Sequence, residues 1–154
     1  MEQNVLHVEN ITMQFGGVVA VNNLSMDIYE HEIVALIGPN GSGKSTILKT
    51  IIGQLPSISG SVFLDGADMR SRSRGDVARR MAILMTARMD PELMTCRDVV
   101  STGRYPYTGW LGIPGKEDLE KVDEALALVS GEELKERDFA AISDGQRQKI
   151  LLAR

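Results

Sequence analysis

The run GPNGSGKST at residues 38–46 constrains the fold of this chain more than any other feature. It matches the phosphate-loop pattern G-x-x-x-x-G-K-[ST], whose fixed positions are here Gly38, Gly43, Lys44 and Ser45. Such a loop aims backbone N–H groups at phosphate oxygens and brings the main chain close to the ligand. Glycine permits this approach because it has no side chain and tolerates positive φ angles. The run therefore predicts a phosphate-binding loop.

The two residues after the last glycine of the loop supply the remaining chemistry. Lys44 places a cation on the β- and γ-phosphates, and the hydroxyl of Ser45 can hold a Mg²⁺ ion. A helix that starts near Gly43 adds its positive dipole end. The predicted ATP-binding residues of this loop are Gly38, Pro39, Asn40, Gly41, Ser42, Gly43, Lys44, Ser45 and Thr46.

The segments on either side of the loop fit the same architecture. Residues 32–37, EIVALI, form a short apolar run that is typical of a buried parallel strand. Residues 44–52, KSTILKTII, have apolar side chains at helical spacing. Strand, glycine loop and helix are the order that the motif requires. A glycine-rich turn between two core elements is the less favoured alternative.

Composition and charge exclude several classes of protein. The chain has 154 residues, of which 43% are hydrophobic and 25% charged, as in an ordinary soluble globular domain. No apolar run approaches the roughly 18–20 residues needed to span a bilayer. Cys96 is the only cysteine, so we expect a buried thiol and neither a disulfide framework nor a cysteine-based metal site. The net charge of −4 gives no support for a nucleic-acid partner.

Periodicity divides the chain into a strand-rich part and a helical part. Further strands are expected at residues 5–12, 24–29, 61–66 and 81–85, with a turn at Gly16-Gly17. The polar, basic run at 69–76 is expected to be a solvated loop, with a phosphate-binding patch as the alternative. An apolar stripe at 117–130 predicts a helix that ends before Gly131. We therefore predict a nucleotide-binding core at 1–86, a helical subdomain at 87–142, and a last segment at 143–154.

The C-terminal run ISDGQRQKILLAR at 142–154 carries a second motif. Ser143 is a plausible N-cap for a helix that begins near Gln146, and the motif alone fits any capped helix. With the phosphate loop upstream, however, it resembles the LSGGQ signature of ABC-type ATPases. Phe15 resembles the aromatic residue that stacks on adenine in that family, although alone it would be read as a buried strand-end aromatic.

The whole chain thus resembles the nucleotide-binding subunit of an ABC transporter. The resemblance implies an α/β P-loop NTPase core with an inserted helical subdomain, and ATP with Mg²⁺ as ligands. It also implies a head-to-tail pair of subunits, in which ATP lies between the phosphate loop of one subunit and the signature of the other. The implied signature residues are Ser143, Asp144, Gly145 and Gln146. Membrane-spanning permease subunits are the other implied partners, which places the protein in the cytoplasm, on the inner face of the cell membrane.

Two positions depart from the family pattern. Asp144 replaces the first glycine of the signature, and a carboxylate near a triphosphate is unfavourable unless it faces solvent or a basic group. Thr86 stands where the family has a glutamine that senses Mg²⁺ and the attacking water. Its hydroxyl could make a weaker contact, and the coupling between nucleotide and helical part is then altered.

The resemblance also implies elements that the sequence does not contain. In the family, a Walker B strand ending in Asp-Glu and a switch histidine follow the signature helix, but the chain stops at Arg154 inside a helical run. We expect this chain to be the front three-fifths of a subunit. Lys44 is then its only catalytic candidate, and the chain alone should bind ATP without hydrolysing it.

The transported solute is only weakly encoded. The run GRYPYTGWLG at 103–112 resembles subunits of iron–siderophore, haem and cobalamin importers, whereas the N-terminal part resembles subunits for branched-chain amino acids. We follow the helical part, because in the family it faces the transporter. Tyr105, Tyr107 and Trp110 are then exposed contacts to a membrane subunit, or else pack within the helical part.

Two other functions remain open at this stage. One is a nucleotide-binding remnant without turnover, either a truncated product or a competitor for dimer partners. The other is a different phosphate-loop enzyme, such as a small-molecule kinase, against which the signature argues.

Overall fold

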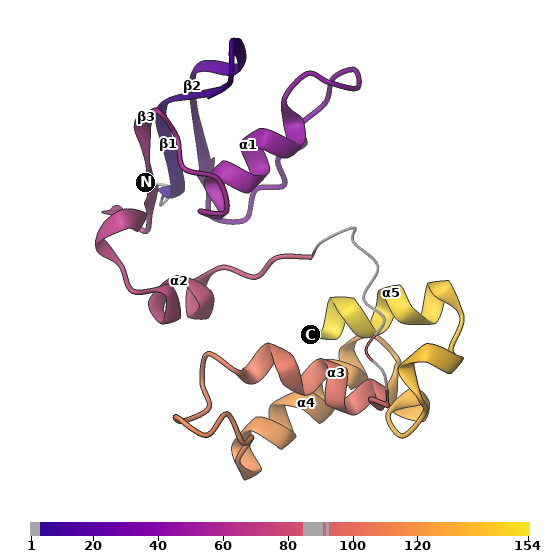
Figure 1. Cartoon of the computed structure of the whole chain (residues 1–154). Coiled ribbons are helices and arrows are strands. Elements are labelled where there is room, and N and C mark those ends of the chain that lie inside the picture. Colours follow the sequence, from indigo (N-terminus) through magenta and orange to yellow (C-terminus); the bar gives the residue numbers. More distant parts are fainter. Residues whose placement is uncertain (1–3, 85–90, 92) are drawn as a thin grey trace. The chain divides into compact units, whose positions relative to one another are not determined.

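The computed structural model describes residues 4–84, 91 and 93–154, and the chain divides into two compact units, Met1–Val77 and Ala78–Arg154 (Figure 1). The elements of the first unit are β1 (Asn4–Phe15), β2 (Val18–Tyr29), α1 (Lys44–Ile51), β3 (Ser59–Leu64), β4 (Ala67–Asp68) and the 3₁₀ turn η1 (Met69–Ser71). Helix α2 (Arg74–Arg80) crosses the boundary between the units. The second unit contains α3 (Cys96–Ser101), η2 (Thr102–Arg104), α4 (Lys116–Leu128), η3 (Glu132–Leu134), η4 (Phe139–Ala141) and α5 (Asp144–Ala153).

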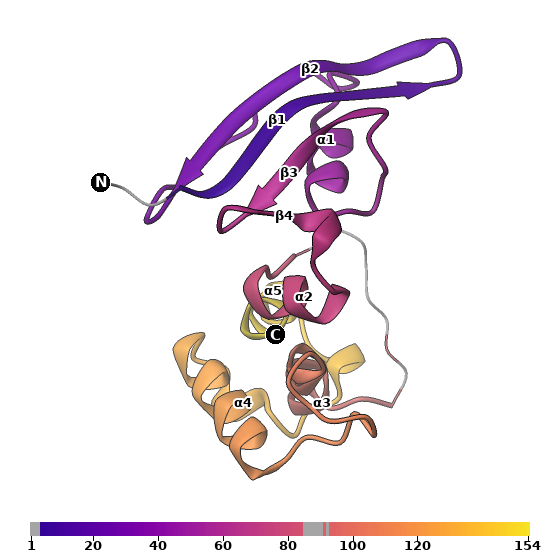
Figure 2. The same cartoon turned by 90° about the vertical axis from the view of Figure 1, so that its left-hand side faces the viewer.

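The first unit is built on an antiparallel sheet with strand order β2-β1-β3-β4 (Figure 2). The buried side chains of β1 are Leu6, Val8, Ile11 and Met13, so the two-residue alternation shifts by one residue after Val8. The ladder has register shifts at this point, and Asn10 has a positive φ of 50°. An irregularity of this kind keeps the apolar side chains on both sides of it on the buried face of the sheet. Without it, the shift of one residue would turn the later apolar side chains toward solvent.

Several predicted elements of this unit are confirmed. Strands β1 and β2 meet at the Gly16-Gly17 turn, β3 covers most of the predicted strand 61–66, and α1 begins at Lys44. Helix α1 places Ile47 and Ile51 in the buried core of the unit, while Leu48 stays exposed.

The predicted strand at 32–37 is wrong for this structure. Residues 33–37 have no strand assignment, and Ile33 and Ile37 are 100% and 90% exposed. A β-strand needs at least one neighbouring strand to which it is hydrogen-bonded. Among the described residues, the strands β1 to β4 pair with one another in a separate antiparallel sheet that does not include this segment.

Two other sequence predictions also need correction. Residues 81–84 have no strand assignment, and Ile83 and Leu84 are exposed, because no strand in the described part of the chain pairs with them. Residue 85, the end of that predicted strand, lies outside the described residues. The run at 69–76, expected to be a loop, contains η1 and the start of α2. Hydrogen bonds from the backbone N–H groups of Arg70 and Asp76 to the side chains of Asp68 and Ser73 start these two turns.

The second unit packs α3, α4 and α5 around one apolar core. Its buried members are Cys96, Val99, Val100, Val122, Leu126, Leu134, Phe139, Ile142 and Ile150. The predicted helix at 117–130 corresponds to α4, and Val122 and Leu126 of its stripe are buried. The prediction that Cys96 is buried is confirmed, and burial raises the pKa of its thiol, which makes it less reactive.

The helix starts of this unit are fixed by side chains. Thr95 and Asp98 form a capping box at α3, and the carboxylate of Asp118 accepts the N–H of Gly115 at the start of α4. That hydrogen bond, followed by the one from Arg104, lowers the pKa of Asp118. None of the helices in the described ranges combines the length and apolarity needed to cross a bilayer. The predicted boundaries at 86/87 and 142/143 stay predictions.

Candidate nucleotide-binding site

The glycine-rich loop between residue 37 and α1 adopts a tight conformation at the end of the helix. Gly43 is the N-cap of α1 with φ 87°, and Gly41 has φ 84°. Residues with a Cβ rarely adopt such angles, and glycine at both positions allows them without a steric penalty. The result is a turn that aims the N-terminal end of α1, where backbone N–H groups lack intrahelical acceptors, into the loop.

Close contacts fix the loop to its surroundings. A Cβ at Gly43 would lie 2.6 Å from the carbonyl oxygen of Ala20 on β2, and a Cβ at Gly38 would lie 2.7 Å from Oγ of Ser42. A Cβ at Gly41, by contrast, would meet no atom within 4 Å. The base of the loop is therefore packed against β2, whereas its tip is open to solvent and to ligands.

Lys44 lies across the loop that it belongs to. Its Nζ donates hydrogen bonds to the carbonyl oxygens of Gly38 and Pro39, each at 2.7 Å. An ammonium group has three donors, so a head group held in this way can also donate to an anion inside the loop. The positive charge is thus positioned by the backbone of the loop itself.

The two residues that follow Lys44 in α1 differ in what surrounds them. Ser45 is exposed in the first turn, and the carbonyl of Thr46 accepts a hydrogen bond from Oγ1 of Thr50 at 2.8 Å. A serine hydroxyl is a hard oxygen donor of the type that Mg²⁺ takes together with substrate phosphates. No group of three or more His, Cys, Asp or Glu side chains in the described part of the chain could hold a metal by itself. The residues present fit an ion that arrives with its nucleotide.

Phe15 lies at the end of β1, where it pairs with Val18 across the hairpin turn. Phe15, Val18 and Val19 are all exposed apolar side chains. Val18 is two residues from Ala20, or roughly 7 Å along a strand, and the carbonyl of Ala20 faces Gly43. The hairpin therefore brings an exposed aromatic ring into the neighbourhood of the phosphate loop.

The four predicted signature residues lie in the second unit, at the start of α5. Ser143 caps the helix, since Gln146 N donates to Ser143 Oγ, while Ser143 N and Oγ donate to Gln146 Oε1 at 3.0 and 3.1 Å. The expected N-cap is confirmed, although the helix begins at Asp144 rather than near Gln146. A Cβ at Gly145 would meet nothing within 4 Å, so this end of the helix is open. Thr86 lies outside the described residues.

Arg147, which the sequence motif did not single out, interacts with one residue of the motif and with two residues of the preceding turn η4. Its Nη2 donates to the carbonyl of Ala140 at 2.6 Å, and its Nη1 lies 3.8 Å from Oδ1 of Asp144. Its guanidinium also lies 5.9 Å from the ring centroid of Phe139. The i, i+3 spacing of Asp144 and Arg147 was the available signal, because such pairs face each other on a helix.

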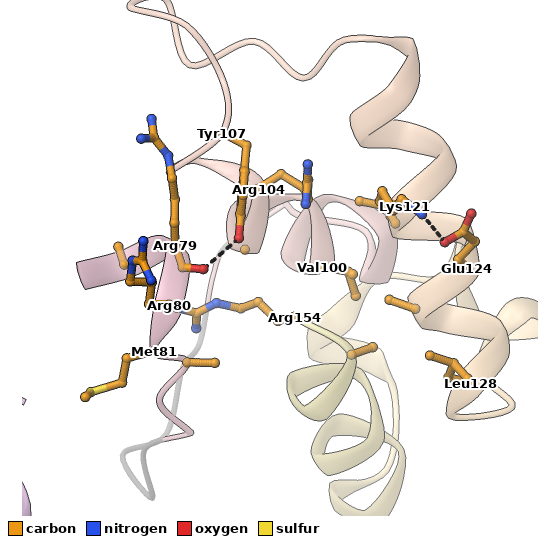
Figure 3. Close-up of a pocket in the computed structure, with 16 residues that line it drawn as sticks. Arg79, Arg80, Met81, Val100, Arg104, Tyr107, Lys121, Glu124, Leu128 and Arg154 are labelled. Carbon is orange, nitrogen blue, oxygen red and sulfur yellow. Dashed lines mark hydrogen bonds and ion pairs between the residues drawn. The ribbon is translucent and has the colours of Figure 1, made fainter. Parts of the chain in front are cut away.

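Basic side chains also gather around a hollow of about 440 Å³ in the second unit (Figure 3). Its basic lining residues are Arg79, Arg80, Arg104, Lys121 and Arg154. Several of these head groups already bind protein atoms. Arg104 pairs with Asp118 at 2.9 Å, Lys121 with Glu124 at 2.7 Å, and Nε of Arg79 donates to the carbonyl of Pro106. These groups do not converge on one point, and we assign no ligand to the hollow.

Comparisons with known proteins place this geometry in context. A family model described as ABC transporter matches residues 21–154. An uncharacterised ABC transporter ATP-binding protein of Methanocaldococcus jannaschii is 41% identical over 150 residues, which are 97% of this chain and 52% of that protein. The petrobactin import ATP-binding protein of Bacillus anthracis is 37% identical over 151 residues, 98% of this chain and 55% of that protein.

The solved structures agree with the sequence comparison. An ATP-binding cassette of an ABC transporter in its ADP conformation superposes with a TM-score of 0.83 at 26% identity, covering 98% of this chain and 63% of that one. This chain therefore spans about half the length of the curated relatives that it matches.

Proposed function

This chain belongs to the ABC transporter family, and on that premise we propose that it binds MgATP as part of the ATP-binding subunit of an importer. The predicted fold class, an α/β P-loop NTPase of the ABC type, is confirmed by the family match and the structural neighbours. The observation that carries the proposal is the phosphate loop, in which Lys44 is held over the loop and the N-terminal end of α1 is aimed into it.

Each part of the nucleotide has a proposed partner in the first unit. The loop residues Gly38 to Thr46 bind the phosphates, with Lys44 on the β- and γ-phosphates and Ser45 on Mg²⁺. Phe15 stacks on the adenine, which its exposure at the hairpin end supports. The ion supplies electrostatic stabilisation of the phosphates when bound.

A second subunit completes the site in this proposal. The helix N-terminus at Ser143 to Gln146 contacts the γ-phosphate of ATP held by the partner, as an anion site of backbone N–H groups. The open space at Gly145 supports this role, because a phosphate oxygen needs direct access to the backbone there.

We propose an iron–siderophore as the solute, or else haem or cobalamin. Relatives named for petrobactin, ferric hydroxamate and ferric enterobactin transport support this class. Tyr105 and Trp110 are exposed, which favours contact with a membrane-spanning permease subunit over packing within the helical part. Tyr107 is also exposed, but its hydroxyl donates to the carbonyl of Arg79 at 3.0 Å and its ring lies 4.1 Å from the guanidinium of Arg104, which favours packing within the second unit for this residue. The protein then acts at the inner face of the cell membrane.

Hydrolysis is assigned to the complete subunit. The relatives extend beyond the matched part, and we propose that the groups that position the attacking water lie there. The residues of this chain bind and orient ATP, with Lys44 stabilising charge on the γ-phosphate. A nucleotide-binding remnant without turnover is the alternative, and phosphate release by the full-length subunit distinguishes the two.

The test of ATP binding is the Lys44→Ala variant. Losing a charge-assisted hydrogen bond costs about 1.5–3 kcal/mol, so the affinity for MgATP should fall about 10- to 140-fold. Titration of a fluorescent ATP analogue measures it. Lys49→Ala is the matched control, because Lys49 is an exposed lysine in the last turn of the same helix. Equal affinities for the two variants would refute the proposed site.

A further inference from the structure

The first residue of α5 places a negative charge beside a proposed anion site. Asp144 lies in the first turn, and its side chain is 78% exposed. An acidic residue at this position stabilises a helix through the dipole. The same carboxylate repels an anion that approaches the backbone N–H groups of the turn. The proposed binding of a phosphate here therefore requires a group that offsets the charge of Asp144.

Arg147 has the position and the rigidity for this task. Its side chain is only 19% exposed, and its guanidinium is held by the carbonyl of Ala140 at 2.6 Å and lies over the ring of Phe139. Its Nη1 faces Oδ1 of Asp144 at 3.8 Å. A guanidinium that is already fixed loses little further freedom when it holds a carboxylate. The pair thus joins a fixed cation to an exposed acid one helical turn away.

We propose that Arg147 is a positioning residue that compensates Asp144 and so keeps the N-terminal end of α5 competent to bind phosphate. The proposal rests on the proposed function of residues 143–146 as a contact for the nucleotide of a partner subunit. Arg147 draws the carboxylate toward the side of the helix and offsets its charge, while the backbone at Gly145 stays open. Asp144 and Arg147 should therefore act as one unit in anion binding.

The coupling predicts that the effect of Arg147→Gln on phosphate binding depends on whether Asp144 is present. With Asp144 present, Arg147→Gln should weaken phosphate binding about fivefold, the ratio that roughly 1 kcal/mol produces. With Asp144→Gly, which removes the charge, Arg147→Gln should have an effect of less than about twofold. Arg147→Lys, which keeps the charge, should preserve most of the binding in the Asp144 background. Asp144→Gly alone should bind more tightly than the unaltered turn.

The experiment uses the whole chain in a Lys44→Ala background, which weakens binding at the phosphate loop. Inorganic sodium triphosphate is titrated into ¹⁵N-labelled protein, and the amide signals of residues 144–146 report the dissociation constant. Arg147→Gln removes the charge and keeps an N–H donor on a shorter side chain, so its effect on local structure must be measured separately. Thermal melting of each variant measures how far Arg147→Gln destabilises the fold. A purely structural effect of Arg147→Gln would lower the melting temperature and the binding equally with Asp144 present and in the Asp144→Gly background.

The outcomes separate the inference from the proposed function. A loss that appears with Asp144 present and vanishes in the Asp144→Gly background supports the coupling. An equal loss in both backgrounds overturns it and makes Arg147 a structural residue only. If no variant shows saturable shifts at residues 144–146, the proposed role of this turn as an anion site is itself refuted.

Discussion

The Gly43→Ala substitution tests how the phosphate loop is held. In this structure Gly43 has φ 87°, and an added Cβ would lie 2.6 Å from the carbonyl oxygen of Ala20. Gly41→Ala is the matched control, because Gly41 has φ 84° but open space around the position of a Cβ. The two variants therefore share the backbone strain and differ in the collision with β2.

The structure gives the size of each effect. An L-residue in the left-handed region costs roughly 1–2 kcal/mol, which applies to both variants. Overpacking adds typically 1–3 kcal/mol where surrounding atoms must move, and here the obstacle is backbone, which yields less easily than a side chain. The free energy of unfolding of the first unit should thus fall by about 1–2 kcal/mol in Gly41→Ala and by about 2–5 kcal/mol in Gly43→Ala.

Amide hydrogen exchange of β1 and β2 without nucleotide is the assay, since it reports the stability of this unit separately from the helical unit. Measuring without nucleotide matters, because a Cβ at Gly41 could also touch a bound phosphate. Equal losses for the two variants would refute the argument, since they would mean that α1 moves away from Ala20 without cost.

Two further predictions concern the first unit. Phe15→Ala should lower the affinity for ATP about 2- to 13-fold, because an offset stack contributes about 0.5–1.5 kcal/mol beyond burial; Phe15→Tyr should keep it, and unchanged ATP and GTP affinities in the Ala variant would make Phe15 a packing residue. Hydrogen bonds from His7 first, and then Asn4, lower the pKa of Asp27 from its ordinary 3.8, so its stabilising contribution is present above about pH 4 and is lost as the pH falls through the lowered pKa. Urea midpoints between about pH 5 and 2.5 should fall less steeply in Asp27→Asn, and equal slopes would contradict this.

Local sequence signals predicted the elements that depend on local contacts. The Gly16-Gly17 turn, the start of α1, and the cap at Ser143 each follow from residues within a few positions of one another. The stripe at 117–130 gave α4 for the same reason, since helical hydrogen bonds lie within the segment. These elements carry both proposed binding regions, which is why the candidate site was visible in the sequence.

The two predicted strands that failed depend on distant partners. Residues 32–37 and 81–84 have the composition of buried strands, but a strand exists only where another strand pairs with it. Periodicity reports the preference of a segment and not the presence of its neighbour. Arg147 was missed for a related reason, because its bond to Ala140 follows from the folded turn at η4 and not from a motif.

The loop keeps its form even though the segment before it is not a strand. Its shape follows from the positive φ angles of Gly41 and Gly43, from the contact of Gly43 with β2, and from the two carbonyls that hold Lys44. None of these contacts involves residues 33–37, whose apolar side chains are largely exposed. The form of the loop is therefore independent of strand pairing by residues 33–37. The exposed apolar side chains of this segment should promote association between chains and leave the form of the loop unchanged.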